Sequence, residues 1–105
     1  MLDLFIKNGE VVFPRVGVQK VNIGVKDGKI VGIYNKEQQL DADRTIDAHG
    51  LHVLPGVIDP HQHLGIYNSM EDDFADTKQH ALSGITTVIN FDRQPVSYLE
   101  WFPEV

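Results

Sequence analysis

The pattern of the chain changes near residue 51, and this change limits the folds open to it. Before that point, short apolar runs are separated by the turn dipeptides Asn8-Gly9 and Asp27-Gly28. Such dipeptides supply the positive φ angles that tight hairpin turns require. After that point, the pattern is strand, helix and strand. We therefore expect an α/β chain, with a small antiparallel β unit in residues 1–52 and a β-α-β unit in residues 53–105.

The β unit is expected to contain two hairpins and one further strand. Each turn dipeptide has an apolar run on both sides, and alternating apolar and polar residues are typical of a strand with one buried face. The polar stretch at residues 35–44 indicates a solvated loop before the last strand. The expected strands cover residues 2–6, 11–13, 21–25, 30–34 and 45–47.

The β-α-β unit is predicted from its boundary signals. Residues 51–58 form an apolar run, and Ser69 with Asp72 three residues later is typical of a capping box that starts a helix. Gly84 suits the end of that helix. Residues 85–89 are rich in β-branched side chains, which favours a buried parallel strand. The inner face of the helix is expected to contain Phe74, Thr77, Ala81 and Leu82.

Composition excludes several classes of protein. The chain has 105 residues and a net charge of −6, with 9 Lys and Arg against 15 Asp and Glu. It lacks an apolar window of the roughly 18 residues a membrane helix needs, and it lacks a secretory signal, so we expect a cytoplasmic protein without a membrane partner. The acidic balance argues against nucleic-acid binding. Because there is no cysteine, any metal must be bound by imidazole and carboxylate groups.

Two histidines carry the strongest chemical signal. His61 and His63 are two residues apart, so in an extended backbone their side chains point to the same side, with Cα atoms about 6.5–7 Å apart. They directly follow an apolar strand, and parallel α/β folds build their sites at the carboxyl ends of strands. We predict that both are metal ligands. Asp59, two residues before His61, is expected to orient a ligand through a hydrogen bond.

Three further residues are candidates for substrate contact. Asn90 and Asp92 come at the carboxyl end of the second parallel strand, and Tyr67 lies in the loop after the first. His49 and His52 lie near a turn and are expected to be exposed. We assign no catalytic residue within this chain.

The segment 54–63, with the sequence LPGVIDPHQH, resembles the signature of the amidohydrolase superfamily of metal-dependent hydrolases. Upstream, residues 6–9, 25–30 and 46–50 look like the small β-sandwich of that superfamily. Downstream, residues 71–89 are similar to the first helix and second strand of the cyclic amidases. That branch contains dihydropyrimidinases, hydantoinases, allantoinases and dihydroorotases.

This resemblance implies a fold and a chemistry. Residues 1–52 would be the N-terminal β-sandwich portion, and residues 53–105 the start of a metal-dependent (β/α)8 barrel: strand 1, helix 1, strand 2 and the start of helix 2. The implied substrate is a small cyclic amide, hydrolysed at a C–N bond. The implied cofactor is a divalent metal, zinc, in a binuclear centre where His61 and His63 bind the more buried ion. The other ligands in the family come from later barrel strands.

Departures from the branch patterns bear on the substrate. Dihydroorotases carry an arginine just after their His-x-His-Leu, whereas Leu64 is followed here by Gly65-Ile66-Tyr67. Their Met-Pro-Asn-Thr type of sequence is also replaced, by residues 90–95. Hydantoinases usually have paired glycines where this chain has Ser83-Gly84. The resemblance therefore favours a hydantoinase-like or dihydropyrimidinase-like relative over a dihydroorotase.

Two classes of function stay open. The first is the N-terminal part of a hydantoinase-, dihydropyrimidinase- or allantoinase-like hydrolase, inactive as this chain alone because a barrel needs about 250 residues and a tight zinc site three or four protein ligands. The second is a truncated non-catalytic remnant or interaction fragment. Within the enzyme class, another amidohydrolase chemistry, such as that of a deaminase or deacetylase, also stays open. The exposed strand 85–89 further predicts self-association or a homo-oligomer.

Overall fold

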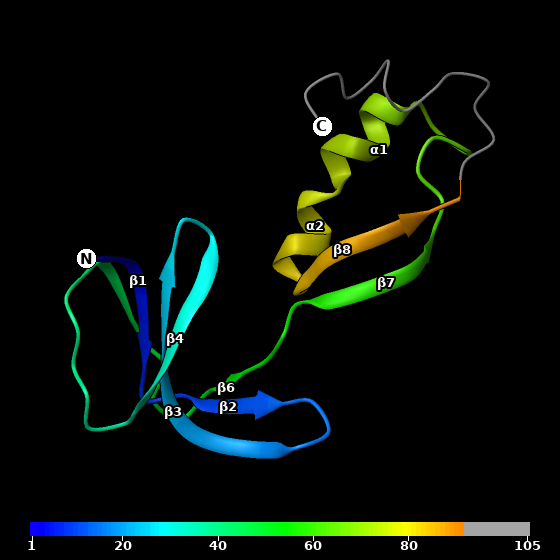
Figure 1. The fold of residues 1–105 in the computed structure, drawn as a ribbon. Coiled ribbons are helices and arrows are strands. Elements are labelled where there is room, and N and C mark those ends of the chain that lie inside the picture. Colours follow the sequence, from blue (N-terminus) through cyan, green and yellow to red (C-terminus); the bar gives the residue numbers. More distant parts are fainter. Residues whose placement is uncertain (92–105) are drawn as a thin grey trace. The chain divides into compact units, whose positions relative to one another are not determined.

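The computed structural model describes residues 1–91, and the chain forms two compact units, Met1–Pro55 and Gly56–Val105 (Figure 1). Each unit is considered by itself. In residues 1–91, no helix is long and apolar enough to cross a membrane. The elements are β1 (Leu2–Lys7), β2 (Glu10–Phe13), β3 (Gly17–Lys26), β4 (Lys29–Asn35), β5 (Ala42–Asp47), β6 (His52–Val53), β7 (Val57–Gln62), α1 (Met70–Asp76), α2 (Lys78–Leu82) and β8 (Ile85–Asn90).

The first unit is built around the long strand β3. Its first part, from Gly17 to Lys20, pairs with β2, and its second part pairs with β1 on one side and β4 on the other. The strand order is β5-β1-β3-β2-β6, with β4 joined to β3. The hairpin between β3 and β4 confirms the second predicted hairpin, and its turn residues Asp27 and Gly28 have φ angles of 50° and 70°.

The first predicted hairpin is wrong. Asn8 has the expected positive φ of 63°, but β1 and β2 do not pair with each other, because both pair with β3. The Asn8 N–H donates to the side-chain oxygen of Asn22 in β3, at 3.0 Å. A side chain from the central strand therefore takes the place of a local turn hydrogen bond. After Asn8, the chain continues into β2, which pairs with a different part of β3 than β1 does.

The prediction of an antiparallel β unit is also wrong in part, because the unit contains parallel pairs. β5 runs parallel to β1, and β6 runs parallel to β2. The loop at residues 36–41 returns the chain to the start of β1, where the Leu2 N–H donates to the carbonyl of Asp41 at 3.4 Å. A strand that re-enters at that end must run in the same direction as β1.

The core of the first unit is small and contains one polar residue. Phe5 is 1% exposed, and Val11, Ile23 and Ala48 are buried as well. Asn22 is fully buried, with 0% exposed. Its Nδ2 donates to three carbonyl oxygens at the end of β4 and in the next loop, at 2.8–3.3 Å. Buried amides are tolerated when their hydrogen bonds are made, as they are here.

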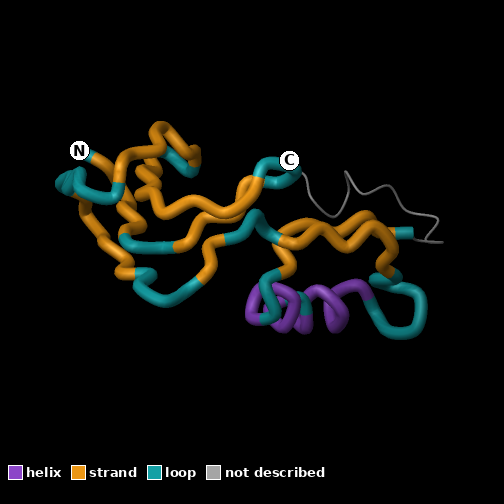
Figure 2. The backbone as a smooth tube through the Cα atoms, turned by 90° about the horizontal axis from the view of Figure 1, so that it is seen from below, coloured by secondary structure: helices purple, strands orange, loops and turns teal. Residues whose placement is uncertain are grey.

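The second unit has the predicted β-α-β order. β7 and β8 are parallel, and α1 and α2 lie along one face of the pair in both views (Figures 1 and 2). Ser69 caps α1 as predicted, since its Oγ accepts from the Asp72 N–H at 3.1 Å. The strand pair places the ends of β7 and β8 beside each other, with Gln62 opposite Asn90.

The helical segment differs from the prediction in two ways. It is interrupted at Thr77, whose Oγ1 and N–H both donate to the Phe74 carbonyl, at 2.6 and 3.1 Å. Such bonds to the carbonyl three residues earlier compete with regular helical hydrogen bonds. The expected inner face is also wrong for Phe74 and Leu82, which are 50% and 79% exposed, and for Ala81, which is exposed. Thr77 and His80 are half-buried. The expected start of the second barrel helix and the candidate residue Asp92 lie outside the described residues.

Candidate functional site

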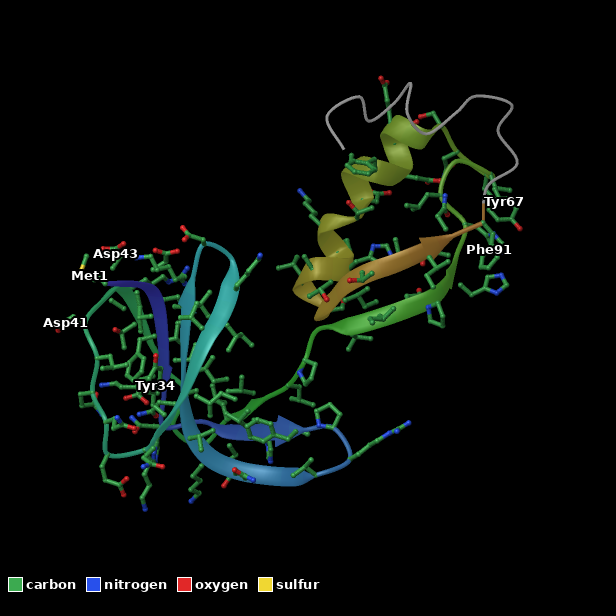
Figure 3. All side chains as sticks on the ribbon, in the orientation of Figure 1. Met1, Tyr34, Asp41, Asp43, Tyr67 and Phe91 are labelled. Carbon is green, nitrogen blue, oxygen red and sulfur yellow. The ribbon has the colours of Figure 1, made fainter. Side chains whose placement is uncertain are left out.

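The carboxyl end of the β7–β8 pair holds the predicted metal ligands. His61 is in β7, and His63 directly follows that strand. The register of the pair is irregular between Asp59 and Gln62, so the chain bulges where His61 lies. Bulges commonly redirect side chains at the ends of sheets. Figure 3 labels Phe91, which directly follows β8 at this end.

The two imidazoles face each other through their ε nitrogens. The Nε2 atoms of His61 and His63 are 3.0 Å apart, and the rings are nearly perpendicular, at 80°. Both side chains are exposed. The ring of Phe91 lies against that of His61, with centroids 4.8 Å apart. The structure thus brings together the two histidines that the sequence spacing singles out.

The hydrogen-bond partner of His63 defines which nitrogen carries the proton. His63 Nδ1 lies 3.1 Å from the backbone carbonyl oxygen of Phe91. Because a carbonyl can only accept, Nδ1 is the donor, and Nε2 of the neutral ring keeps its lone pair. His61 Nε2 is then the donor in the contact between the two rings. A ligating histidine typically has this arrangement, with its second nitrogen bonded to a carbonyl or carboxylate.

The spacing of the two nitrogens fits a shared cation. Tetrahedral zinc with Zn–N bonds of about 2.0–2.1 Å separates two ligand nitrogens by about 3.3 Å. The observed separation of 3.0 Å is a few tenths of an ångström shorter, which a small ring rotation would correct. Within residues 1–91, however, no three His, Asp or Glu side chains lie close enough together to hold an ion. Residues 1–91 thus bring together two potential metal ligands, His61 and His63.

The other predicted site residues have different surroundings. The Asp59 carboxylate accepts from the backbone N–H of His61 at 3.1 Å, so it contacts the backbone and not the ring. Asn90 Oδ1 accepts from the Leu64 N–H at 2.7 Å, and Asn90 Nδ2 donates to the Leu64 carbonyl at 3.3 Å. Tyr67 is 84% exposed in the loop beyond β7 (Figure 3). The role of Asp59 toward a metal ligand, and those of Asn90 and Tyr67 toward a substrate, stay predictions.

Asp73 of α1 holds the loop that follows His63. Its carboxylate accepts from the side chain of Asn68 at 2.9 Å and from the Gly65 N–H at 2.7 Å. These two hydrogen bonds lower the pKa of Asp73 below its usual value, and the bond from Asn68 has the larger effect. The ionised form is the one that the loop stabilises, so Asp73 favours the folded loop at neutral pH.

This arrangement predicts the acid response of the loop. A carboxyl group with a lowered pKa stabilises the fold above its ordinary pKa of about 3.9, and that contribution is lost as the pH falls through the lower folded value. We expect the Gly65 amide signal to titrate with a midpoint below about 3.9 by NMR. Asn68→Ala should raise that midpoint. An equal midpoint in both proteins would contradict the assignment.

Sequence reasoning missed Phe91 and Asp73 as parts of this site. Phe91 contributes a backbone carbonyl, which every residue type has, so no sequence motif could indicate it. The acidic residues from Glu71 to Asp73 all lie in the first turn of α1, so the sequence does not distinguish them. Only the fold shows that Asp73 accepts a hydrogen bond from the Gly65 N–H.

The first unit has a cavity of about 320 Å³, which is lined by none of the predicted site residues. Glu10, in its wall, is paired with Lys20 at 3.7 Å, and its other carboxylate oxygen lies 3.2 Å from Nε2 of His52. The lining residues are Asn8, Glu10, Lys20, Lys36, His49 and Gly50.

Comparison with known proteins finds relatives both by sequence and by structure. No family model matches the chain. An allantoinase from Desulfitobacterium hafniense (strain Y51) is 42% identical over 90 residues, covering 86% of this chain and 20% of that protein. The structure is similar to that of an L-hydantoinase (dihydropyrimidinase) from Arthrobacter aurescens, with a TM-score of 0.79 and 35% identity, over 99% of this chain and 24% of that one.

A third relative was solved with a metal. An N-acyl-D-glutamate deacylase from Bordetella bronchiseptica, complexed with zinc and a phosphonate inhibitor, aligns with a TM-score of 0.68 and 30% identity. That alignment covers 83% of this chain and 18% of the deacylase. The chain spans about a fifth of the length of the curated relatives it matches, at 20% of each of the first two.

Proposed function

Since this chain belongs to the amidohydrolase superfamily, in its cyclic amidase branch, and corresponds to an N-terminal part of these proteins, we propose that it supplies two metal ligands to a hydrolase of cyclic amides. The observation that carries the proposal is the 3.0 Å approach of the Nε2 atoms of His61 and His63 at the carboxyl ends of two parallel strands. In barrel enzymes this end of the strands carries the active site.

The chain's own groups would act as follows. A divalent ion supplies Lewis acidity toward an amide carbonyl and toward water when it is bound. His63 already presents the Nε2 lone pair, because the Phe91 carbonyl holds the proton on Nδ1. His61 would have to move its proton from Nε2 to Nδ1 to present a second lone pair. The Phe91 ring contacts the ring of His61, with centroids 4.8 Å apart.

The proposed setting of these residues is a (β/α)8 barrel. β7, the α1–α2 segment and β8 would be its first strand, first helix and second strand, and the first unit would be part of the accompanying β-sandwich. Two observations support this: the parallel β7–β8 pair has helices along one face, and the alignment with the L-hydantoinase covers 99% of the chain. Further metal ligands and a proton-transferring aspartate would come from the other strands.

We propose a five- or six-membered cyclic amide as the substrate class. The names of the relatives support it, as they include an L-hydantoinase and an allantoinase. The residues after Leu64 lack the arginine with which a dihydroorotase would hold a carboxylate, so dihydroorotate is disfavoured. Two imidazoles fall short of the three or four protein ligands of a tight zinc site, so the 105-residue chain is expected to be inactive by itself.

A zinc titration of the 105-residue chain, labelled with ¹⁵N-histidine, tests the metal assignment. Zinc should change the ring nitrogen signals of His61 and His63 and leave those of His49 and His52, both exposed in the first unit, unchanged. A response of equal size at all four histidines would mean unspecific binding and would contradict the proposal.

Activity assays test the substrate class separately. The 105-residue chain should not hydrolyse hydantoin, dihydrouracil or allantoin above the buffer rate. A longer chain that carries these residues together with the remaining barrel strands should hydrolyse at least one of the three, and not dihydroorotate. Turnover by the short chain, or of dihydroorotate alone by the longer one, would overturn the corresponding part of the proposal.

A further inference from the structure

The peptide units on both sides of His63 are tied to the end of β8. On one side, the Gln62 carbonyl accepts from the Phe91 N–H at 2.8 Å. On the other, the Leu64 N–H and carbonyl are both bonded to the side chain of Asn90, at 2.7 and 3.3 Å. The carboxamide of Asn90 thus takes the place of a backbone peptide and continues the pairing of β7 and β8 beyond the last residue of β7.

The ring of His63 is held at the same point. Its Nδ1 donates to the Phe91 carbonyl at 3.1 Å, so the ring and its two flanking peptides all contact residues 90–91. The ring contact depends on where the backbone lies, because a shift of the chain at Leu64 would carry the imidazole away from that carbonyl. Hydrogen bonds weaken steeply with distance and angle, so a displacement of about 0.5 Å would be enough to weaken this one.

We propose that Asn90 is a positioning residue that fixes the orientation and the tautomer of His63 through the backbone of Leu64. This inference rests on the proposed metal function for its purpose, but the contacts themselves belong to the metal-free chain. Outer-shell groups that fix a ligating histidine usually contribute 10–100-fold to metal affinity. Asn90 would act indirectly, because it contacts the backbone of Leu64 and not the His63 ring.

Two substitutions separate the parts of this contact. Asn90→Leu has a similar shape but removes both hydrogen bonds to Leu64. Asn90→Asp keeps an oxygen that can accept from the Leu64 N–H and removes the donor to the Leu64 carbonyl. Thr87→Ala is the matched control, because Thr87 is an exposed residue of the same strand. Cross-strand contacts between β7 and β8 in NMR spectra show whether each variant keeps the strand pair.

The first measurement is the protonation pattern of the His63 ring in the metal-free 105-residue chain, from long-range ¹H–¹⁵N spectra at about pH 8.5, where imidazoles are ordinarily neutral. The wild-type protein and Thr87→Ala should have the proton on Nδ1. Asn90→Leu should give a mixture of the two tautomers, and Asn90→Asp an intermediate result. If Asn90→Leu loses the strand pair, Asn90→Asp decides the question.

The second measurement is zinc affinity by calorimetry, where Asn90→Leu should bind about 10-fold more weakly than Thr87→Ala. A Nδ1-protonated His63 in a folded Asn90→Leu, or in Asn90→Asp where Asn90→Leu is unfolded, would overturn the positioning role. If instead the tautomer responds as expected but the wild-type chain binds no zinc at His61 and His63, the proposed metal function fails and the positioning role stands.

Discussion

Replacing Asn22 by alanine should lower the free energy of unfolding of the first unit by about 3 kcal/mol, because each buried polar group left without a partner costs about 1–3 kcal/mol. The substitution leaves the Asn8 N–H and the carbonyls of Lys36 and Gln38 without Asn22 as their partner, while the Asn35 carbonyl keeps its hydrogen bond from the Gln38 N–H at 3.0 Å. Those groups are part-buried, so water would satisfy some of them, and the cost falls short of the full sum. For a unit of this size, the loss is a large fraction of a typical total of about 5–15 kcal/mol.

The measurement is a urea titration of the 105-residue chain, followed through amide signals of β1 and β3 so that it reports on the first unit. Gln19→Ala is the control, since Gln19 is an exposed residue of β3 and should change stability by about 0.5 kcal/mol or less. If Asn22→Ala and Gln19→Ala had the same effect, the buried amide would not be what connects β3 with the ends of β1 and β4.

Replacing His63 by alanine should weaken zinc binding by at least the roughly 10–100-fold that loss of an outer-shell partner costs, because it removes a ligand itself. His61→Ala should have an effect of similar size. The backbone at Leu64 remains tied to Asn90 in both variants, so the strand pair should persist. Calorimetric titration of the 105-residue chain with zinc measures the change.

The control for this prediction is His49→Ala, which removes an exposed imidazole from the first unit and should leave zinc affinity unchanged. Equal affinities of the wild-type protein, His61→Ala and His63→Ala would contradict the assignment of these histidines as ligands. A loss in His49→Ala alone would move the binding site to the cavity of the first unit.

Features set by neighbouring residues were predictable from the sequence. The turn at Asp27-Gly28 needs positive φ at both positions, and the hairpin there is formed as predicted. The cap of α1 at Ser69 and the β-branched strand beside β7 depend likewise on local composition. The spacing of His61 and His63 indicated their convergence because residues two apart share a face of an extended chain.

Features set by distant partners were not predictable. Asn8 has the backbone angle of a hairpin turn, but its N–H is bonded to Asn22, fourteen positions away in the sequence, and the hairpin does not form. The apolar Phe74 was expected to be on the inner face of its helix, and it is 50% exposed. Which face of a short helix is covered depends on the neighbouring strands, and periodicity in so few residues does not define it.

The sequence by itself determined that this chain carries two imidazoles at the end of a strand in a β-α-β unit, because spacing, turn residues and β-branched runs act over a few positions. Only the tertiary structure decided how those imidazoles are held. The Phe91 carbonyl gives His63 its protonated Nδ1, and the Asn90 carboxamide holds the backbone of Leu64. Both contacts join residues 26 to 28 positions apart, so they exist only once β7 and β8 lie side by side.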